Sequence, residues 1–155
     1  FLGGVVTATH LAYNLECACV YPEKKVIALA TEGRREQSEI VFGRHEIEDG
    51  EYVLIVEDVL NNFSTTAQLV SLIREQGGKV IGVAGILNRS PIVDTEFTLS
   101  DGTVLPVISF LRRQIPEYRQ DDPVVAEDVA RGNVVWKPKS RDAWARLMAA
   151  MEAAK

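Results

Sequence analysis

The sequence predicts an α/β protein whose central sheet is mostly parallel and flanked by helices. The first observation is a set of short apolar runs, at Val26–Ala30, Tyr52–Val56 and Lys79–Leu87, which are typical of strands buried on both faces. The second is that segments with helical apolar spacing separate these runs. The third is the length of 155 residues, which matches one domain, so we expect a single domain over residues 1–155.

The composition excludes several other classes of protein. A hydrophobic content of 46% and a charged content of 25% are ordinary for a globular domain. The net charge of −5 argues against a broad nucleic-acid surface, and no run approaches the ~20 apolar residues of a bilayer span. Cys17 and Cys19 are too few for a disulfide framework, so we expect them to pack in the core of a cytoplasmic protein.

The first elements begin abruptly. Because the chain starts in apolar residues without a Met, we expect an N-terminal part to be missing. Phe1–Val6 is predicted as a buried strand that Gly3-Gly4 bends, and Ala8–Cys19 as a helix capped by Thr7 or Thr9.

A polar loop separates the next two predicted strands. The run Val26–Ala30 is followed by residues 31–37, where Arg34 and Arg35 lie, and then by a short strand at Ile40–Phe42. This composition is typical of an exposed and mobile connection.

The clearest strand is Tyr52–Val56, which ends in Glu57-Asp58. Ser64 or Thr65 is predicted to cap the following helix. Gly77-Gly78 ends that helix because glycine readily adopts the left-handed conformation after a helix C-terminus, and the strand Lys79–Leu87 comes next.

After Arg89 the pattern changes. Phe97–Leu105 predicts an antiparallel hairpin around Ser100-Asp101-Gly102, followed by a short strand at Leu105–Leu111. Asp122 is predicted to cap a helix at Pro123–Ala130. A final helix is expected at residues 140–153, where the large side chains at helical spacing are interpreted as core or interface residues: Trp144, Leu147, Met148 and Met151.

The chemistry is expected after the clearest strand. Glu57 and Asp58 come at its carboxyl end, and a short polar loop leads into a helix. Ligands of open α/β sheets bind at this edge, and free N–H groups at a helix start attract phosphate. Acids beside such a site can hold ribose hydroxyls or a hydrated Mg²⁺ that also binds phosphates. The sequence therefore predicts a sugar-phosphate site.

Glu57-Asp58, with the polar loop and Ser64-Thr65 behind it, resembles the phosphoribosyl-diphosphate signature of type I phosphoribosyltransferases, and of the orotate subgroup most of all. Three other stretches resemble that subgroup in the same order. They are Gly77–Val83, Leu87–Ser90 (an Asp-Arg-Ser segment in the family) and Trp136–Arg141.

The resemblance implies phosphoribosyl transfer between phosphoribosyl diphosphate and a pyrimidine base such as orotate. Mg²⁺ would be held mainly by ligand and water, with Glu57 and Asp58 nearby, and a homodimer is expected. It also implies roles for individual residues. Glu57 and Asp58 hold the ribose hydroxyls, Asn61, Asn62, Phe63, Ser64 and Thr65 cradle the 5′-phosphate, Thr7, Ala8, Thr9 and His10 face the diphosphate, Arg34 or Arg35 covers it, and Arg89 meets the base.

The chain also departs from the family pattern. Asn61, Asn62 and Phe63 replace a loop rich in threonine and glycine, and Val6–His10 stands where a glycine pair is expected. Arg34 and Arg35 replace lysines, and a Cys-Pro-x-Cys element is absent before the Lys-Pro stretch. The alternative is therefore a catalytically inactive domain that binds a nucleotide or sugar phosphate in a regulatory role.

Each site residue also has a plainer interpretation. The acids would form a solvated strand end, the asparagines a turn, and Ser64 and Thr65 a helix cap. The arginines would lie on an exposed loop or in a surface ion pair. His10 and His45 lack partners nearby in the sequence, so a metal role is not expected for either.

Overall fold

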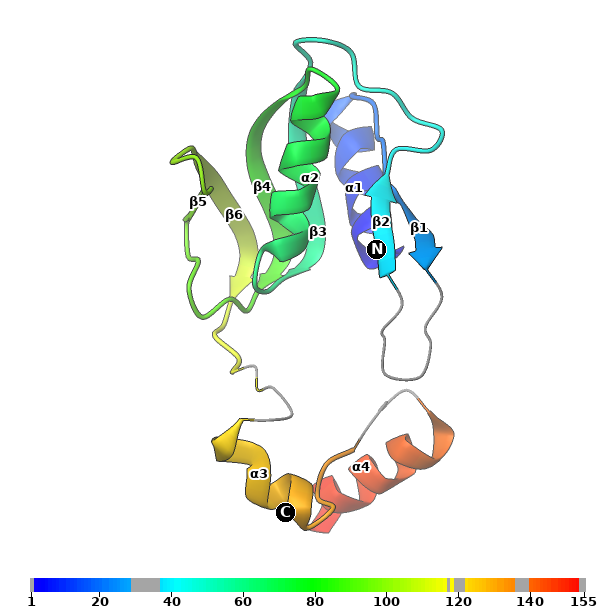
Figure 1. Cartoon of the computed structure of the whole chain (residues 1–155), viewed down its shortest axis with the longest axis vertical. Helices are drawn as coiled ribbons and strands as arrows, with labels where there is room; N and C mark the ends of the chain where they lie inside the picture. Colours follow the sequence, from blue (N-terminus) through cyan, green and yellow to red (C-terminus); the bar gives the residue numbers. More distant parts are fainter. Residues whose placement is uncertain (1, 29–36, 117, 119–121, 136–139, 154–155) are drawn as a thin grey trace. The chain divides into compact units, whose positions relative to one another are not determined.

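The computed structural model describes residues 2–28, 37–116, 118, 122–135 and 140–153. Two compact units are present, Phe1–Ile115 and Pro116–Lys155. Among the described residues, the first unit holds strands β1 to β6 with helices α1 and α2, and the second holds α3 and α4 (Figure 1).

The central sheet has four strands in the order β3-β4-β6-β5. β3 (Tyr52–Leu60) and β6 (Val104–Arg112) both run parallel to β4 (Lys79–Asn88), whereas β5 (Glu96–Thr98) is antiparallel to β6. The mostly parallel α/β sheet and the antiparallel hairpin that the sequence predicts are both confirmed. The parallel strands place the ends of β3, β4 and β6 on one edge.

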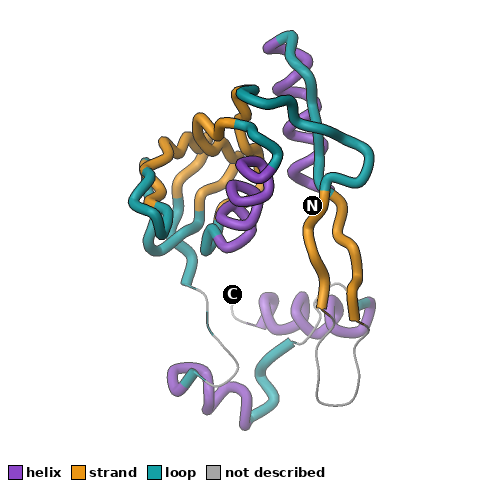
Figure 2. Tube along the Cα trace, turned by 45° about the horizontal axis from the view of Figure 1, so that its top comes forward, coloured by secondary structure: helices purple, strands orange, loops and turns teal. Residues whose placement is uncertain are grey.

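Helix α2 (Ser64–Glu75) covers the sheet with one apolar face (Figure 2). Leu69, Val70 and Ile73 are buried at helical spacing and join the main core with residues of the strands. Gly77 takes φ +90°, and Gly78 donates its N–H to the carbonyl of Ile73 at 3.0 Å. The predicted glycine stop is therefore confirmed.

Helix α1 (Leu2–Leu15) corrects the prediction for the start of the chain. The expected strand at Phe1–Val6 is wrong, and the helix expected at Ala8–Cys19 begins earlier and ends at Leu15. The reason is a tertiary contact. Gly3 and Gly4 lie so close to β3 that a Cβ at Gly3 would overlap the Asp58 carboxylate, so only a pair without side chains lets this helix approach the strand.

β1 (Glu23–Ala28) and β2 (Gln37–Val41) form a separate antiparallel pair rather than part of the central sheet (Figure 2). Strands are confirmed near the predicted positions, with shifted bounds. Arg34 and Arg35 fall in the connection between them, which lies outside the described residues.

The second unit contains α3 (Pro123–Ala130) and α4 (Arg141–Ala153). The predicted cap is confirmed, because the Asp122 side chain accepts the N–H of Val124 at 3.0 Å. On α4, Trp144 is 55% and Met148 38% exposed, so neither has the buried core position that was one of the two predictions for it. Over the described part of the chain, no helix combines the length and apolar character needed to cross a bilayer.

Candidate functional site

β3 carries both acids of the predicted site. Glu57 lies opposite Gly85 of β4, and the strand continues through Val59 to Leu60, which pairs with Asn88. The acids therefore lie within the strand, not after it, and the predicted end at Val56 is wrong. The reason is that β4 is itself long enough to pair with these extra residues. The loop at the carboxyl edge of the sheet therefore begins at Asn61.

The loop after β3 is shaped by Asn62 and Phe63. The Asn62 Oδ1 atom accepts the Ser64 backbone N–H at 3.0 Å and its hydroxyl at 2.8 Å. Phe63 occupies the N-cap position in the left-handed conformation, with φ 60° and ψ 12°. Ser64 and Thr65 are therefore already inside α2, and the prediction that one of them caps the helix is wrong. Asn62 provides the side-chain acceptor instead.

Phe63 is a bulky residue in the loop that is expected to bind a ligand. Its side chain is only 3% exposed and belongs to the hydrophobic core, where its ring lies 4.8 Å from that of Phe97. The left-handed backbone costs a non-glycine residue roughly 1–2 kcal/mol, which the buried ring can offset. Because the ring enters the core, it leaves the space above the loop open.

A pocket of about 130 Å³ lies over this loop. That volume is roughly ten times the ~10–15 Å³ that a single water requires. The residues that line it are Glu57, Val59, Leu60, Asn61, Asn62, Phe63, Thr65 and Thr66. The structure thus brings Glu57, three loop residues and Thr65 together at the start of α2, an arrangement that suits a small anion. Asp58 and Ser64 do not line this pocket.

The Glu57 side chain is partly buried. Burial raises its pKa above the ordinary value, and the adjacent Asp58 carboxylate acts in the same direction. Asp58 Oδ1 accepts the Val59 backbone N–H at 2.9 Å. A carboxylate with raised pKa gains from a nearby cation or hydroxyl donor, so the site is better suited to a ligand with hydroxyls or a bound divalent ion than to a bare anion alone.

The first turn of α1 lies beside these acids. A Cβ at Gly4 would lie 3.2 Å from Glu57 Oε2 and 3.3 Å from the Val56 carbonyl oxygen. The first helix therefore does begin with a glycine pair against the acidic strand. The expected departure, in which Val6–His10 stands where a glycine pair is expected before the first helix, stays a prediction, because Gly3 and Gly4 lie inside α1.

Thr7, Ala8, Thr9 and His10 all lie inside α1. Thr7 Oγ1 donates to the Gly3 carbonyl at 3.2 Å, and Thr9 Oγ1 to the Val5 carbonyl at 2.8 Å. Helical backbone N–H groups at these positions are occupied within the helix, so they do not form an exposed anion loop. Their assignment to the diphosphate stays a prediction.

Arg89 follows β4 and is tied to the end of β3. Its backbone N–H donates to the Leu60 carbonyl at 2.9 Å, which sets it next to the loop that lines the pocket. Its Nε atom is buried and has no hydrogen-bond partner among the described residues. Arg89 itself is not one of the residues that line the pocket.

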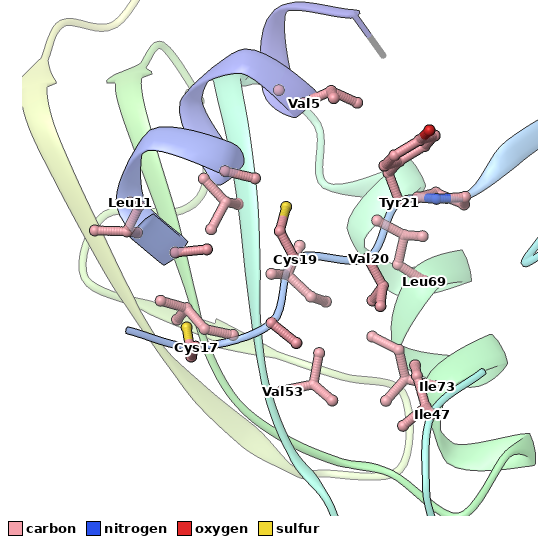
Figure 3. Close-up of a pocket in the computed structure, with 18 of the residues that line it drawn as sticks. Val5, Leu11, Cys17, Cys19, Val20, Tyr21, Ile47, Val53, Leu69 and Ile73 are labelled. Atoms are coloured by element: carbon pink, nitrogen blue, oxygen red, sulfur yellow. The ribbon is translucent and has the colours of Figure 1, made fainter. Parts of the chain in front are cut away.

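A second and larger cavity of about 410 Å³ is lined mainly by apolar side chains of α1, β3, α2 and residues 17–22 (Figure 3). Cys17 and Cys19 both line it, and both are free thiols. Cys17 is exposed and Cys19 half-buried, so their predicted place in a closed core is wrong. The reason is that residues 17–22 run along the cavity beside β3 and not across the centre of the sheet.

His10 lies in α1, and His45 lies in the segment before β3. The His45 ring lies 4.6 Å from the Tyr21 ring in an edge-on contact. Within the described ranges, no group of three or more His, Cys, Asp or Glu side chains could hold a metal ion.

Sequence reasoning missed three contributors to the site. Thr66 is 2% exposed and lines the small pocket, and Gly3 and Gly4 bring α1 to the acids. The helical spacing from Thr66 to the buried Leu69, Val70 and Ile73 is a signal that could have indicated its inward direction. The contact of the glycine pair had no local signal.

The chain is similar to curated relatives named orotate phosphoribosyltransferase. It is 31% identical over 126 residues to the one from Caldicellulosiruptor bescii, covering 80% of this chain and 60% of the relative. It is 29% identical over 142 residues to the one from Caldicellulosiruptor saccharolyticus, covering 90% and 63%. The chain thus spans about 60% of the length of these relatives. No protein-family model matches it.

The fold has a counterpart among solved structures. The purine phosphoribosyltransferase from Pyrococcus horikoshii matches with a TM-score of 0.51 and 19% identity over 76% of each chain. This likeness establishes the architecture. The resemblance that the acidic signature predicts is therefore confirmed: the chain has the type I phosphoribosyltransferase fold and is a sequence relative of the orotate phosphoribosyltransferases.

Proposed function

We propose that this chain carries the phosphoribosyl-transfer site of an enzyme that joins a pyrimidine base such as orotate to the ribose of phosphoribosyl diphosphate. The observation that carries the proposal is the 130 Å³ pocket between Glu57 and the start of α2, which stays open because the Phe63 ring enters the core. The pyrimidine assignment comes from the curated relatives, which are named for orotate.

In the proposed reaction, a nitrogen of the base loses its proton to solvent and forms a bond to the anomeric carbon of the ribose. The bond from that carbon to the diphosphate oxygen breaks, and its electron pair leaves with the diphosphate. The carbon is positively charged in the transition state, so the protein acts by positioning the reactants and by stabilising the departing diphosphate. No covalent nucleophile is needed.

The residues take the following roles in this proposal. Glu57 and Asp58 hold the ribose hydroxyls, and residues 61–65 with Thr66 surround the 5′-phosphate. Arg89 meets the base from the end of β4, and Arg34 or Arg35 covers the diphosphate. The raised pKa of Glu57 supports its role, because hydrogen bonds from ribose hydroxyls stabilise the charged carboxylate that burial disfavours.

The donor set also fits Mg²⁺. Two adjacent carboxylates are hard oxygen donors, and Mg²⁺ is typically held by one or two carboxylates together with waters and substrate phosphates. Glu57 and Asp58 would hold it, directly or through water. When bound, the ion would neutralise the charge that develops on the departing diphosphate.

The proposal is tested by titration calorimetry with phosphoribosyl diphosphate and Mg²⁺, followed by a turnover assay with orotate and, in parallel, adenine. Binding and turnover with orotate are expected. Turnover with adenine alone would overturn the pyrimidine assignment, and absence of binding would overturn the site itself.

A catalytically inactive sugar-phosphate binding domain is the second candidate. The observation that favours it is the position of Thr7–His10 inside a helix, which leaves the diphosphate without a loop from this segment. Binding without turnover of any base would support it. The homodimer and the cytoplasmic location remain part of the main proposal, and light scattering at the assay concentration tests the dimer.

A further inference from the structure

The end of β4 contains a fully buried polar residue, Asn88, which is 0% exposed. Its Nδ2 atom donates to the carbonyl oxygens of Val93 and Asp94, at 3.1 Å each. Its Oδ1 atom accepts the backbone N–H of Ser90 at 3.0 Å. The two carbonyl partners fix the orientation of the amide, because only its nitrogen can donate to them.

Ser90 is also 0% exposed and completes the network. Its Oγ atom accepts the backbone N–H groups of Ile92 at 3.3 Å and Val93 at 3.1 Å. The two buried side chains therefore form hydrogen bonds with backbone N–H and carbonyl groups of a tight loop over residues 88–94. Arg89 lies between them in the sequence.

The backbone of Arg89 is fixed in addition at two points. Its N–H donates to the Leu60 carbonyl at 2.9 Å, and its own carbonyl accepts the Ile115 N–H at 3.3 Å. Arg112 closes the far side of the loop, since its Nη1 donates to the Asn88 carbonyl at 3.2 Å and its Nε to Asp94 at 2.9 Å. The position of the Arg89 backbone at the end of β4 is thus set by hydrogen bonds on both sides of the loop.

We propose that Asn88 is a positioning residue that directs Arg89 toward the base by closing residues 88–94 into a rigid loop. This inference rests on the proposed function, in which Arg89 meets the base. It goes beyond that function because Asn88 itself touches no substrate. A carboxylate at this position could not donate to either carbonyl.

The test separates the contribution of the base from that of the phosphate. Binding of orotidine 5′-monophosphate and of ribose 5-phosphate is measured by calorimetry for the wild-type chain, Asn88→Asp, Arg89→Ala and the double variant. Asn133→Asp, an exposed asparagine in the second unit, is the matched control. The affinity for ribose 5-phosphate measures the contribution of the loop after β3. The ratio of the two affinities measures the contribution of the base to binding.

We expect the wild-type chain to bind the nucleotide more tightly than the sugar phosphate, by about tenfold or more, the size expected for a hydrogen bond to a charged group. Asn88→Asp and Arg89→Ala should each remove most of this preference while ribose 5-phosphate binding stays within about twofold. The double variant should lose no more than Arg89→Ala, because both act through one side chain.

Three outcomes would contradict parts of this picture in distinguishable ways. No preference in the wild-type chain overturns the pyrimidine assignment and removes the premise of the inference. Loss in Arg89→Ala but not in Asn88→Asp overturns the inference alone. If Asn88→Asp weakens the binding of both ligands equally, Asn88 has a merely structural role, and the inference is overturned. If Asn88→Asp does not fold, Ser90→Ala, which removes acceptors from the same loop, is expected to reduce the preference in part, and an unchanged preference overturns the inference.

Discussion

Two loops meet at the carboxyl edge of the sheet, and they are held rigid by different means. The loop after β3 is anchored by an apolar side chain, the Phe63 ring in the core. The loop after β4 is anchored by polar side chains, Asn88 and Ser90, each 0% exposed. Burial of a ring tolerates neighbouring changes of shape, whereas a buried hydrogen-bond network requires every partner. We therefore expect the loop after β3 to contribute mainly to the stability of the fold, and the loop after β4 to set the direction of the Arg89 side chain.

The largest effect is expected at the apolar anchor. Phe63→Ala should reduce the free energy of unfolding by about 3–5 kcal/mol, because it removes a buried ring and leaves a cavity. Phe63→Gly should be less destabilising than the loss of the ring alone implies, since glycine relieves the left-handed strain. Urea unfolding followed by circular dichroism measures both.

The control for this change is Phe110→Ala on β6. Phe110 is 93% exposed, so its loss should alter stability by less than about 0.5 kcal/mol. Equal destabilisation by Phe63→Ala and Phe110→Ala would contradict the anchor role and remove the comparison between the two loops.

Glu57→Gln tests whether the chemistry depends on the acid beside the first loop. Turnover of orotate should fall about 10²-fold, the loss expected when one electrostatic contact to the transition state is removed. Thermal stability at neutral pH should rise, because burial raises the folded-state pKa of Glu57 and the charged form therefore opposes folding. As pH falls through the raised folded pKa toward 4.5, the wild-type chain gains this stability back.

Thermal unfolding of wild-type and variant chains across this pH range checks the second part. Glu75→Gln at the exposed end of α2 is the matched control and should change neither rate nor stability appreciably. A variant that loses stability at neutral pH would show that Glu57 has a structural role instead.

Ser90→Ala should cost about 1–3 kcal/mol, because it leaves the buried N–H of Val93 and the partly buried N–H of Ile92 without their acceptor. Urea unfolding measures this cost, and Ser71→Ala on α2 is a control at an exposed hydroxyl. If Ser90→Ala were as mild as Ser71→Ala, the loop after β4 would not depend on its polar network.

The smallest effect is expected outside both loops, at the turn of the β5–β6 hairpin. The Thr103 backbone N–H and the Arg74 guanidinium lower the pKa of Asp101 from 3.8 to about 2. The charged carboxylate therefore stabilises the fold above about pH 3.8, and this contribution is lost as pH falls toward 2. Asp101→Asn should lower the melting temperature slightly at pH 7, and the difference should vanish near pH 2. A difference that persists at pH 2 would contradict the electrostatic cause.

The sequence determined those features that depend on neighbours along the chain. Apolar runs identified β3 and β4, Gly77 marked the end of α2, Asp122 marked the start of α3, and Ser100-Asp101-Gly102 marked the hairpin. The acidic pair and the polar loop after it also identified the candidate site. Each of these is a local preference of the backbone or a periodic pattern of side chains.

Only the tertiary structure decided the rest. Residues 2–6 are as apolar as a strand, yet they are helical, and Gly3 and Gly4 allow this helix to lie close to the acids of β3. The Phe63 ring packs in the core against Phe97, which lies 34 positions along the chain. The loop that contains Arg89 is closed by a residue as distant in the chain as Arg112, whose Nη1 donates to the Asn88 carbonyl. Contacts between distant residues carry no periodic signal in the sequence, so they are settled only when the chain has folded.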